Sequence, residues 1–313
     1  MSLKDKSLEV LHQETMKYME QCTICPRDCK VNRNLGQKGY CREDSQIKVA
    51  RAALHMWEEP CISGEEGSGT VFFSGCAMGC VFCQNRNIAT DEVGKIVSVE
   101  RLADIFLELQ EKKANNINLV TPSHYVCQIR EAIKLAREKG LKLPIVYNSS
   151  GYEKVETIKL LEGFVDIYLP DMKYFEEAIA MRYSNAKDYF KTASAAIHEM
   201  VRQVGTPQFD NHGNMTKGVI IRHLALPGYD EDSKKILRYL YETYTDQVYL
   251  SIMNQYTPLS YVSHFPEINR KLTDAEYEEL VDYAIDLGVE NGFIQEGETA
   301  SESFIPSFDY EGV

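Results

Sequence analysis

The chain has 313 residues, 44% of them hydrophobic and 26% charged, which is the composition of a folded protein with a substantial core. Its 34 Lys and Arg against 47 Asp and Glu give a net charge of −13, and without a long basic run we expect no nucleic-acid partner. No apolar run approaches the roughly 18 residues of a membrane span, and the N-terminus lacks the apolar centre of a signal peptide, so we expect no membrane partner and a cytoplasmic location.

Residues 1–65 are expected to form an N-terminal helix followed by a cysteine-rich metal-binding lobe. The helical pattern covers about residues 6–20, and four cysteines follow at the spacing C-x2-C-x3-C-x11-C: Cys22, Cys25, Cys29 and Cys41. In a reducing cytoplasm, thiols this close together indicate a bound metal and not disulfides. Tetrahedral zinc and a second Fe–S cluster fit the spacing equally well, and we favour zinc as the simpler way to stabilise a lobe with little core.

Residues 66–313 are expected to form a single α/β domain. Apolar runs rich in β-branched residues occur at 70–74, 116–120, 144–148, 164–169, 218–224 and 247–253, and a shorter run occurs at 291–295. Helical patterns separate these runs, and several begin at Ser, Thr or Asp and end at Gly. Strands that alternate with helices predict parallel βαβ units. About six units predict a partial (β/α)6 barrel and not a complete eight-fold one.

The stretch GCAMGCVFCQN follows the first of these strands directly and contains Cys76, Cys80 and Cys83 at the spacing C-x3-C-x2-C. A [4Fe–4S] cluster has four irons, so three thiolates leave one iron open, and an open metal position is what chemistry requires. The alternative is a zinc knuckle that takes a fourth ligand from elsewhere. The loop follows the carboxyl end of a barrel strand, where barrels place their active sites, and this position favours the cluster.

The cysteine spacing, with Phe82 just before the last cysteine, resembles the signature of the radical S-adenosylmethionine (SAM) superfamily. The resemblance is greatest to pyruvate formate-lyase activating enzyme-like proteins, some of which carry an N-terminal four-cysteine block. It implies an oxidoreductase whose cluster binds SAM and cleaves it reductively to a 5′-deoxyadenosyl radical, which abstracts hydrogen from a substrate. It also implies an electron donor such as flavodoxin or ferredoxin, and a position for Phe82 near the SAM adenine.

The family resemblance suggests a protein substrate, namely the glycine Cα–H of a glycyl-radical enzyme. Two alternatives remain. The chain is a radical SAM enzyme that modifies a small molecule or another peptide, or it is a non-catalytic Fe–S electron-transfer protein. Hydrogen-atom abstraction needs no proton transfer from the protein, so we assign no catalytic side chain.

Polar residues at the ends of the following strands are expected to contact SAM. Thr121 and Ser123 stand where the family has a Gly-Gly-Glu motif for the SAM amino group, and this chain has neither the glycine pair nor the glutamate. Asn148 and Ser149, in YNSSGY, correspond to the family's Asp-Thr-Asn-Gly turn. In this part of the site the chain therefore departs from the family pattern.

The fourth and fifth strands carry the stronger matches. Asp171 and Lys173 match the family's Asp-x-Lys motif, and Arg222 matches an inward arginine before Leu-x-Pro-Gly. A carboxylate and an ammonium two residues apart point the same way on a strand, so both can face one pocket. The alternative for this pair is an ordinary surface ion pair. Arg222 is expected to bind the SAM carboxylate or the substrate, since a guanidinium binds carboxylates through two hydrogen bonds.

Overall fold

The computed structural model describes residues 5–90, 93–295, 306 and 308–313, and its centre is one sheet. The described strands form a ten-stranded sheet in the order β10-β9-β8-β6-β5-β4-β2-β1-β3, with β7 paired to β8 beside this path. Their bounds are β1 (Ile47–His55), β2 (Ser68–Phe73), β3 (Lys95–Val97), β4 (Ile117–Val120), β5 (Ile145–Ser149), β6 (Ile167–Pro170), β7 (Gln208–Phe209), β8 (Met215–Leu224), β9 (Tyr249–Met253) and β10 (Gly292–Ile294).

The sheet is mostly parallel, which confirms the predicted α/β class. Neighbouring strands from β2 through β4, β5, β6, β8 and β9 to β10 all pair in parallel. Each of the seven apolar runs in the sequence contributes one of these strands. The antiparallel strands β1, β3 and β7 were not predicted.

Strand β1 lies in the segment that the sequence assigned to the cysteine-rich lobe, and it extends the barrel sheet instead. The register between β1 and β2 shifts between Val49 and Arg51. Such a bulge interrupts the alternation of buried and exposed side chains by which a strand is recognised in a sequence. The cysteine-rich part of the chain therefore ends before Ile47.

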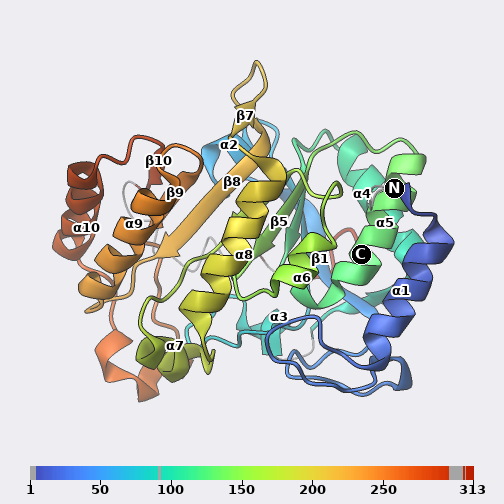
Figure 1. Ribbon diagram of the computed structural model, residues 1–313, viewed down its shortest axis with the longest axis horizontal. Helices are drawn as coiled ribbons and strands as arrows, with labels where there is room; N and C mark the ends of the chain where they lie inside the picture. The colour runs from blue at the N-terminus through green and yellow to red at the C-terminus, as the bar shows by residue number, and fades with distance from the viewer. Residues whose placement is uncertain (1–4, 91–92, 296–305, 307) are drawn as a thin grey trace.

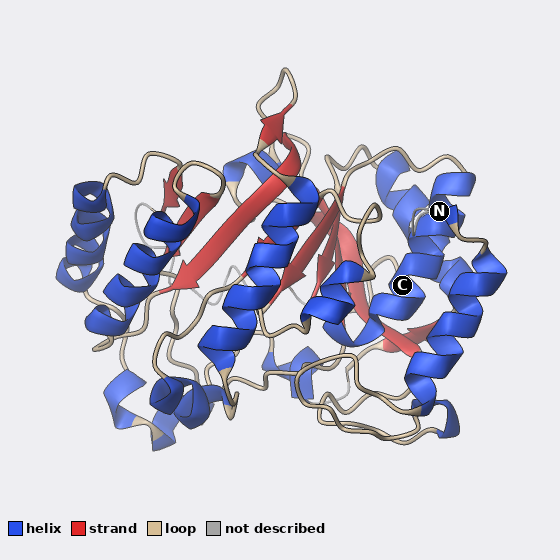
Figure 2. Ribbon diagram, viewed as in Figure 1, coloured by secondary structure: helices blue, strands red, loops and turns tan. Residues whose placement is uncertain are grey.

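The described helices lie mainly in a layer over one face of the sheet, as Figures 1 and 2 show. None of them is long and apolar enough to cross a membrane. Their bounds are α1 (Leu8–Glu20), α2 (Pro60–Ser63), α3 (Arg86–Thr90), α4 (Val99–Glu111), α5 (Val126–Glu138), α6 (Val155–Lys159), α7 (Glu177–Ser184), α8 (Tyr189–Val204), α9 (Asp230–Tyr244) and α10 (Asp274–Leu287), with short 3-10 turns at Arg33–Leu35, Ser123–Tyr125, Ser260–His264 and Pro266–Ile268.

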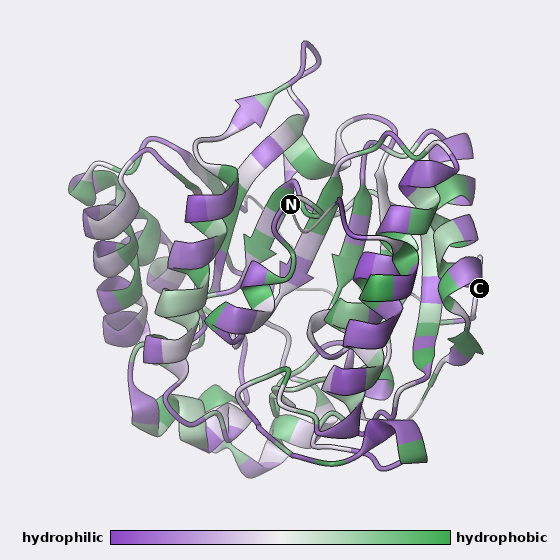
Figure 3. Ribbon diagram, turned by 45° about the vertical axis from the view of Figure 1, so that its right-hand side comes forward, coloured by the Kyte–Doolittle hydropathy of each residue, from purple (hydrophilic) through white to green (hydrophobic). Residues whose placement is uncertain are grey.

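The covering helices are amphipathic and capped, as the sequence pattern predicts. In α4, the buried residues Leu102, Phe106 and Leu109 recur every three to four positions, and the side chain of Ser98 accepts a hydrogen bond from a backbone N–H of the first turn. In Figure 3 the strands are mostly hydrophobic, whereas the outer surfaces of the helices carry most of the hydrophilic residues. Burial of the inward stripes therefore fixes the helices on the sheet.

The opposite, concave face of the sheet is closed at one end by the link between β1 and β2. This link contains α2, and Cys61 and Ile62 of α2 pack against Val146 of β5 and Leu169 of β6. Because β1 runs antiparallel to β2, the link lies at the amino ends of the parallel strands. Figure 1 shows α2 at one end of the sheet, and α3 and the cysteine-rich segment at the other. The link therefore forms a floor beneath the concave face.

Candidate active site

The three-cysteine loop follows β2 at the carboxyl edge of the parallel strands and contacts the N-terminal lobe. Gly75 begins the loop with φ of +85°, in the left-handed region. A Cβ on Gly75 would lie 2.7 Å from the carbonyl oxygen of Cys41 and 2.5 Å from Cγ of Glu43. Only glycine combines this backbone conformation with so close an approach. The two cysteine-rich segments therefore touch at this position.

The thiols of the loop are partly or fully buried and lie within electrostatic reach of one another. The Cys76 sulfur accepts a hydrogen bond from the backbone N–H of Met78 at 3.3 Å, and the Cys80 sulfur accepts one from the Ser184 hydroxyl at 3.0 Å. Burial and then the neighbouring thiols raise the pKa of Cys83 to about 12, whereas the Lys173 ammonium lowers it. A bound metal centre would hold such thiols as thiolates.

The donor set on this loop fits a [4Fe–4S] cluster by its chemistry. Thiolates are the usual ligands of such a cluster, which has four irons. Each pair of Cys76, Cys80 and Cys83 lies within electrostatic reach. Three thiolates would hold three irons and leave the fourth iron open.

In the N-terminal lobe, Cys22, Cys25 and Cys41 lie within electrostatic reach of one another. The backbone N–H of Cys22 donates to Val31 O at 3.0 Å, and the N–H of Tyr40 donates to the Cys29 sulfur at 3.3 Å. Cys22, Cys25 and Cys41 are buried, and all four thiols are free of disulfides. Zinc and a second cluster both stay predictions for this lobe.

Arg27 of the lobe holds the three-cysteine loop in place. Its guanidinium stacks 3.8 Å from the centre of the Tyr40 ring. It donates to four backbone carbonyls, those of Ala77, Met78, Ser184 and Asn185. Two of these carbonyls belong to the three-cysteine loop and two to the end of α7. One side chain therefore ties the lobe, the loop and the outer layer together.

Asp171 and Lys173, just after the end of β6, come together with Arg222 in the last part of β8. Asp171 accepts from Lys173 Nζ at 2.7 Å and from Arg222 Nε at 3.0 Å. Burial alone would raise the pKa of Asp171, but the two cations outweigh it and hold the pKa below the ordinary value. Burial would likewise lower the pKa of Lys173, and Asp171 and Cys80 raise it instead. The three side chains therefore form a buried charged group beside the thiols, and not a surface ion pair.

Two further contacts fix the backbone of this group. The Tyr189 hydroxyl accepts from the Lys173 N–H at 2.9 Å and donates to the carbonyl of Ser150 or Asp171. Gly151 has φ of +74°, and a Cβ there would lie 2.2 Å from the carbonyl oxygen of Asp171. The glycine is therefore required because the turn after β5 presses against the end of β6.

Asn148 joins the charged group, together with Glu58, which the sequence did not indicate. Arg222 donates to Asn148 Oδ1 at 2.7 Å and to Glu58 Oε2 at 3.3 Å. Glu58 lies in the floor link and also accepts from Asn118 of β4 at 3.0 Å. Burial raises the pKa of Glu58, and Arg222 lowers it only in part. No sequence signal indicated Glu58, because the link follows a strand that was not predicted.

The structure does not bring Ser123 and Ser149 to this group. Ser149 follows Asn148 on a strand, so it points to the opposite face. Both serines interact with the buried carboxylate of Glu153. Burial raises the pKa of Glu153 to about 7, although the hydroxyl groups lower it. The two serines therefore lie on the helix-covered side.

Thr121 and Phe82 occupy unusual environments near the site. Thr121 has φ of +59°, which is costly for a β-branched residue and turns the chain sharply after β4. The Phe82 ring is buried and makes edge contacts at 5.9–6.4 Å with three tyrosines, Tyr174, Tyr183 and Tyr256. The structure thus places Phe82 in an aromatic cluster beside the thiols.

His124 supports the start of the three-cysteine loop. Its Nε2 lies 2.7 Å from the carbonyl oxygen of Ser74, to which it donates. Burial and the nearby Arg33 lower the pKa of His124 to about 3, so the ring is neutral. Arg33 is fully buried and donates to the His124 carbonyl at 2.6 Å. His124 belongs to the segment that stands in place of the family's Gly-Gly-Glu motif. In this chain that segment supports the three-cysteine loop.

Comparison with known proteins identifies the family. A family model described as the radical SAM superfamily matches residues 70–240, which contain the three thiols and the charged group. The chain belongs to the radical SAM superfamily. This radical SAM protein is 28% identical over 292 residues to an uncharacterized protein of Methanocaldococcus jannaschii, a match that covers 90% of this chain and 79% of the relative.

Two solved structures are similar to parts or all of this radical SAM protein. Methylornithine synthase (PylB) matches with a TM-score of 0.50 and 14% identity, over 99% of this chain and 87% of PylB. Streptococcus suis SuiB matches with a TM-score of 0.49 and 14% identity, over 74% of this chain and 49% of SuiB. The match therefore spans about half the length of SuiB. The likeness to PylB agrees with the predicted partial barrel and shows the fold alone.

Membership of the radical SAM superfamily confirms the resemblance inferred from the three-cysteine loop. The superfamily implies a [4Fe–4S] cluster and SAM as cofactors. The described structure places Cys76, Cys80 and Cys83 on one loop and a buried cation, Lys173, within electrostatic reach of them. These residues fit the implied cofactors by their chemistry.

Proposed function

We propose that this protein is a radical SAM oxidoreductase that removes a hydrogen atom from a substrate bound over the concave face of the sheet. The observation that carries the proposal is that the three thiols Cys76, Cys80 and Cys83 and the group Asp171–Lys173–Arg222 lie at one edge of the sheet. Bound there, the cluster and SAM supply the electron transfer and the radical that removes the hydrogen.

The side chains of the site bind and orient the cofactors. Lys173 and Arg222 offer N–H donors for a carboxylate, and Asp171 holds both cations in place at 2.7 and 3.0 Å. With no Gly-Gly-Glu motif, the backbone carbonyls at the strained turn of Thr121 are the proposed acceptors for the SAM ammonium. The aromatic cluster around Phe82 excludes water from the thiol side.

Two substrate classes have support. The resemblance to activating enzymes favours the glycine Cα–H of a glycyl-radical enzyme. The chain lacks the Gly-Gly-Glu motif of the activating enzymes, and this departure favours the second class, a small molecule or another peptide. A flavodoxin or ferredoxin is the proposed electron donor for either class.

The first prediction tests SAM cleavage. Cluster-loaded protein with SAM and dithionite, kept anaerobic, is expected to release 5′-deoxyadenosine, which chromatography measures. Cys80→Ala is expected to reduce the release at least about 100-fold, since one of three cluster ligands is lost. The matched control is Cys61→Ala, because Cys61 lies on α2 at the amino ends of the parallel strands, at the opposite end of the sheet from the three-cysteine loop, and this variant should keep the activity.

Two outcomes decide against parts of the proposal. A firmly bound cluster without any 5′-deoxyadenosine would identify a non-catalytic electron-transfer protein. With a glycyl-radical enzyme deuterated at its glycine, transfer of deuterium into 5′-deoxyadenosine would select that substrate class. Cleavage of SAM without transfer of deuterium would exclude that glycyl-radical enzyme as the substrate.

A further inference from the structure

The end of helix α7 meets the three-cysteine loop at Cys80. The backbone N–H of Val81 donates to the carbonyl of Tyr183 at 2.8 Å, and the Ser184 hydroxyl donates to the Cys80 sulfur at 3.0 Å. The carbonyl of Ser184 accepts a further hydrogen bond from Arg27 of the lobe at 3.0 Å. These contacts fix the Ser184 side chain beside the Cys80 sulfur.

The hydroxyl of Tyr174 extends this contact into a chain of hydrogen bonds. Its oxygen lies 2.7 Å from Ser184 Oγ, and it is also within hydrogen-bonding reach of the Cys80 thiol. A thiolate that binds a metal has no proton to donate, so Ser184 donates to Cys80 and Tyr174 donates to Ser184. Burial and the Cys80 thiol raise the pKa of Tyr174 well above its ordinary value, so this hydroxyl keeps the proton that it donates.

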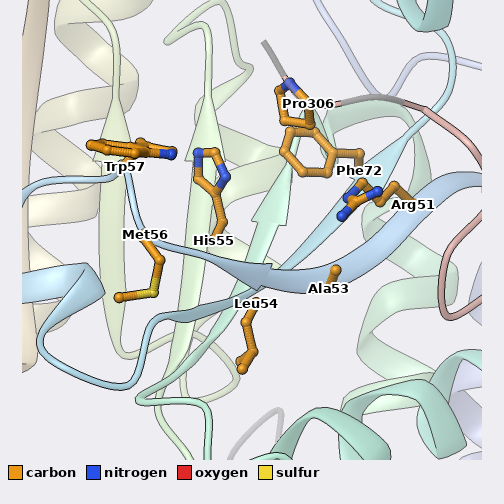
Figure 4. Close-up of a pocket in the computed structure, with 8 residues that line it drawn as sticks. All are labelled: Arg51, Ala53, Leu54, His55, Met56, Trp57, Phe72 and Pro306. Carbon is orange, nitrogen blue, oxygen red and sulfur yellow. The ribbon is translucent and has the colours of Figure 1, made fainter. Parts of the chain in front are cut away.

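The two hydroxyl groups are shielded from water. Tyr174 is 0% exposed and Ser184 is 2% exposed. The Tyr174 ring makes edge contacts with Phe82, at 6.4 Å, and with Tyr189, at 5.3 Å. Figure 4 shows a pocket of about 210 Å³ against β1, and neither Tyr174 nor Ser184 is among the residues that line it. A hydrogen bond in such a dry setting is stronger than one in water.

Hydrogen bonds to the sulfurs of an iron–sulfur cluster are among the factors that set its reduction potential. Reduction adds one electron, so a ligating sulfur is more negative in the reduced state and then binds a donor more strongly. A hydroxyl that donates to Cys80 therefore favours the reduced cluster and raises its potential. The electron comes from the flavodoxin or ferredoxin proposed above, and in this step no proton is transferred and no covalent bond breaks.

We propose that Ser184 and Tyr174 are positioning residues that raise the reduction potential of the cluster through the sulfur of Cys80. Ser184 donates to the sulfur, and Tyr174 polarises the Ser184 hydroxyl and fixes its direction. The consequence for the reaction is that the electron donor reduces a larger fraction of the cluster. The inference rests on the proposed function, because it requires a cluster bound to Cys80. It goes further by assigning control of the potential to two residues outside the three-cysteine loop.

The experiment measures the reduction potential of the cluster in the full-length, cluster-loaded protein. The protein is titrated anaerobically with dithionite in the presence of redox mediators, and EPR spectroscopy measures the reduced fraction at each potential. Ser184→Ala is expected to shift the equilibrium toward the oxidised cluster about tenfold, which is about 59 mV toward more negative potential for one electron. Tyr174→Phe is expected to shift it in the same direction by less, because Ser184 still donates to the sulfur.

The matched control is Ser194→Ala on α8, where the hydroxyl donates to the Phe190 carbonyl of the same helix at 2.6 Å. This variant should leave the potential unchanged.

The sign of the shift separates a lost donor from a loosened site. A loosened site admits water, which stabilises the more highly charged reduced cluster and raises the potential, whereas the loss of the Ser184 donor lowers the potential. Tyr174→Phe removes only a hydroxyl and keeps the buried ring, so it tests the same chain of hydrogen bonds if Ser184→Ala does not fold.

A second measurement detects the hydrogen bond itself. ENDOR spectroscopy of the reduced cluster in H2O and in D2O shows the exchangeable protons that are coupled to the cluster. The unmodified protein and Ser194→Ala should show one such proton that Ser184→Ala lacks.

The outcomes distinguish a failure of the inference from a failure of the proposed function. An unchanged or raised potential in Ser184→Ala and Tyr174→Phe, with the cluster bound, would overturn the inference alone. In that case the unmodified protein would still release 5′-deoxyadenosine. An unmodified protein that binds no iron on the three-cysteine loop would overturn the proposed function, and the inference with it.

Discussion

At the scale of single residues, Asp171 holds two buried cations on one carboxylate. Its oxygens accept from Lys173 at 2.7 Å and from Arg222 at 3.0 Å, and without Asp171 the buried Arg222 would keep only Glu58, at 3.3 Å, as a carboxylate partner. Removing one partner of a buried ion pair is costly because it leaves a charge uncompensated. Asp171 is therefore expected to stabilise the folded chain as well as the site.

The stabilisation by Asp171 should depend on pH in a definite direction. The folded state holds the pKa of Asp171 below the ordinary value of 3.8, so the contribution is fully present above that value and is lost as pH falls through the folded pKa. Asp171→Asn should lower the free energy of unfolding by about 3–5 kcal/mol at pH 7, and by progressively less below about pH 4. Urea unfolding at several pH values measures the difference.

The control for Asp171 is Asp282→Asn, an exposed position on α10. It should change the free energy of unfolding by less than about 0.5 kcal/mol at every pH. If the two variants show the same dependence on pH, Asp171 does not form a stabilising ion pair.

Gly151 allows a different test, of backbone geometry. Alanine at this position would need φ of +74°, at a cost of about 1–2 kcal/mol, and its Cβ would also meet the Asp171 carbonyl at 2.2 Å. Gly151→Ala should therefore destabilise the protein more than Gly140→Ala, where φ is +108° and nothing lies within 4 Å of the added atom. Equal destabilisation of the two variants in urea would refute the close contact at Gly151.

At the scale of elements, the three-cysteine loop depends on a neighbour far away in sequence. Arg27 donates to the carbonyls of Ala77 and Met78 at 2.7 and 3.1 Å, so the lobe supports the loop without supplying it with a thiol. The loop, by contrast, has few backbone hydrogen bonds of its own. The N-terminal lobe is therefore part of the support of the candidate active site.

Arg27→Ala is expected to loosen the cluster rather than abolish it. Losing these hydrogen bonds to a charged group, worth about 1.5–3 kcal/mol, should speed the removal of iron by a chelator at least about tenfold. The absorbance of the chelator–iron complex follows the rate. The control is Arg238→Ala, which removes an exposed arginine on α9 and should leave the rate of iron removal unchanged. If Arg27→Ala also left that rate unchanged, the three-cysteine loop would not depend on the lobe.

The sequence predicted best those strands whose run of apolar residues is set by burial alone. Each of the seven parallel strands is an apolar run, and in β2, β4, β5 and β6 every residue is buried because both faces of these strands are covered. For the same reason the sequence did not reveal which face carries which side chain, so Asn148 and Ser149 both became candidates although they point to opposite sides. Strand β1 was missed because its bulge at Val49–Arg51 breaks the alternation.

At the scale of the whole molecule, the site combines groups from segments that are far apart in the chain. The thiols, Asp171, Lys173 and Arg222 were predictable because each follows or ends a strand, and parallel strands bring their carboxyl ends to one edge. Glu58 and Arg27 were not predictable, since their positions depend on how a floor link and a lobe pack on the finished barrel. Contacts of that kind have no local signature.

The metal content of the whole chain distinguishes the two predictions for the N-terminal lobe. We expect about four irons and one zinc per chain, with one [4Fe–4S] cluster on the loop and zinc at the four lobe cysteines. The double variant Cys22→Ser/Cys25→Ser should lose the zinc and, because the lobe supports the three-cysteine loop, release its iron to a chelator faster than the unmodified protein. Elemental analysis that finds about eight irons would replace zinc by a second cluster.

The contact at Gly75 has a consequence for how such a protein is assembled and redesigned. Because the loop that carries the three thiols begins against the backbone of Cys41, removing the first lobe would also remove the surface on which that loop is shaped. A shortened barrel that starts at β2 would keep Cys76, Cys80 and Cys83. It would lack the backbone of Cys41, against which the loop that carries them packs. The two cysteine-rich segments are thus one structural unit, although 34 residues separate Cys41 from Cys76.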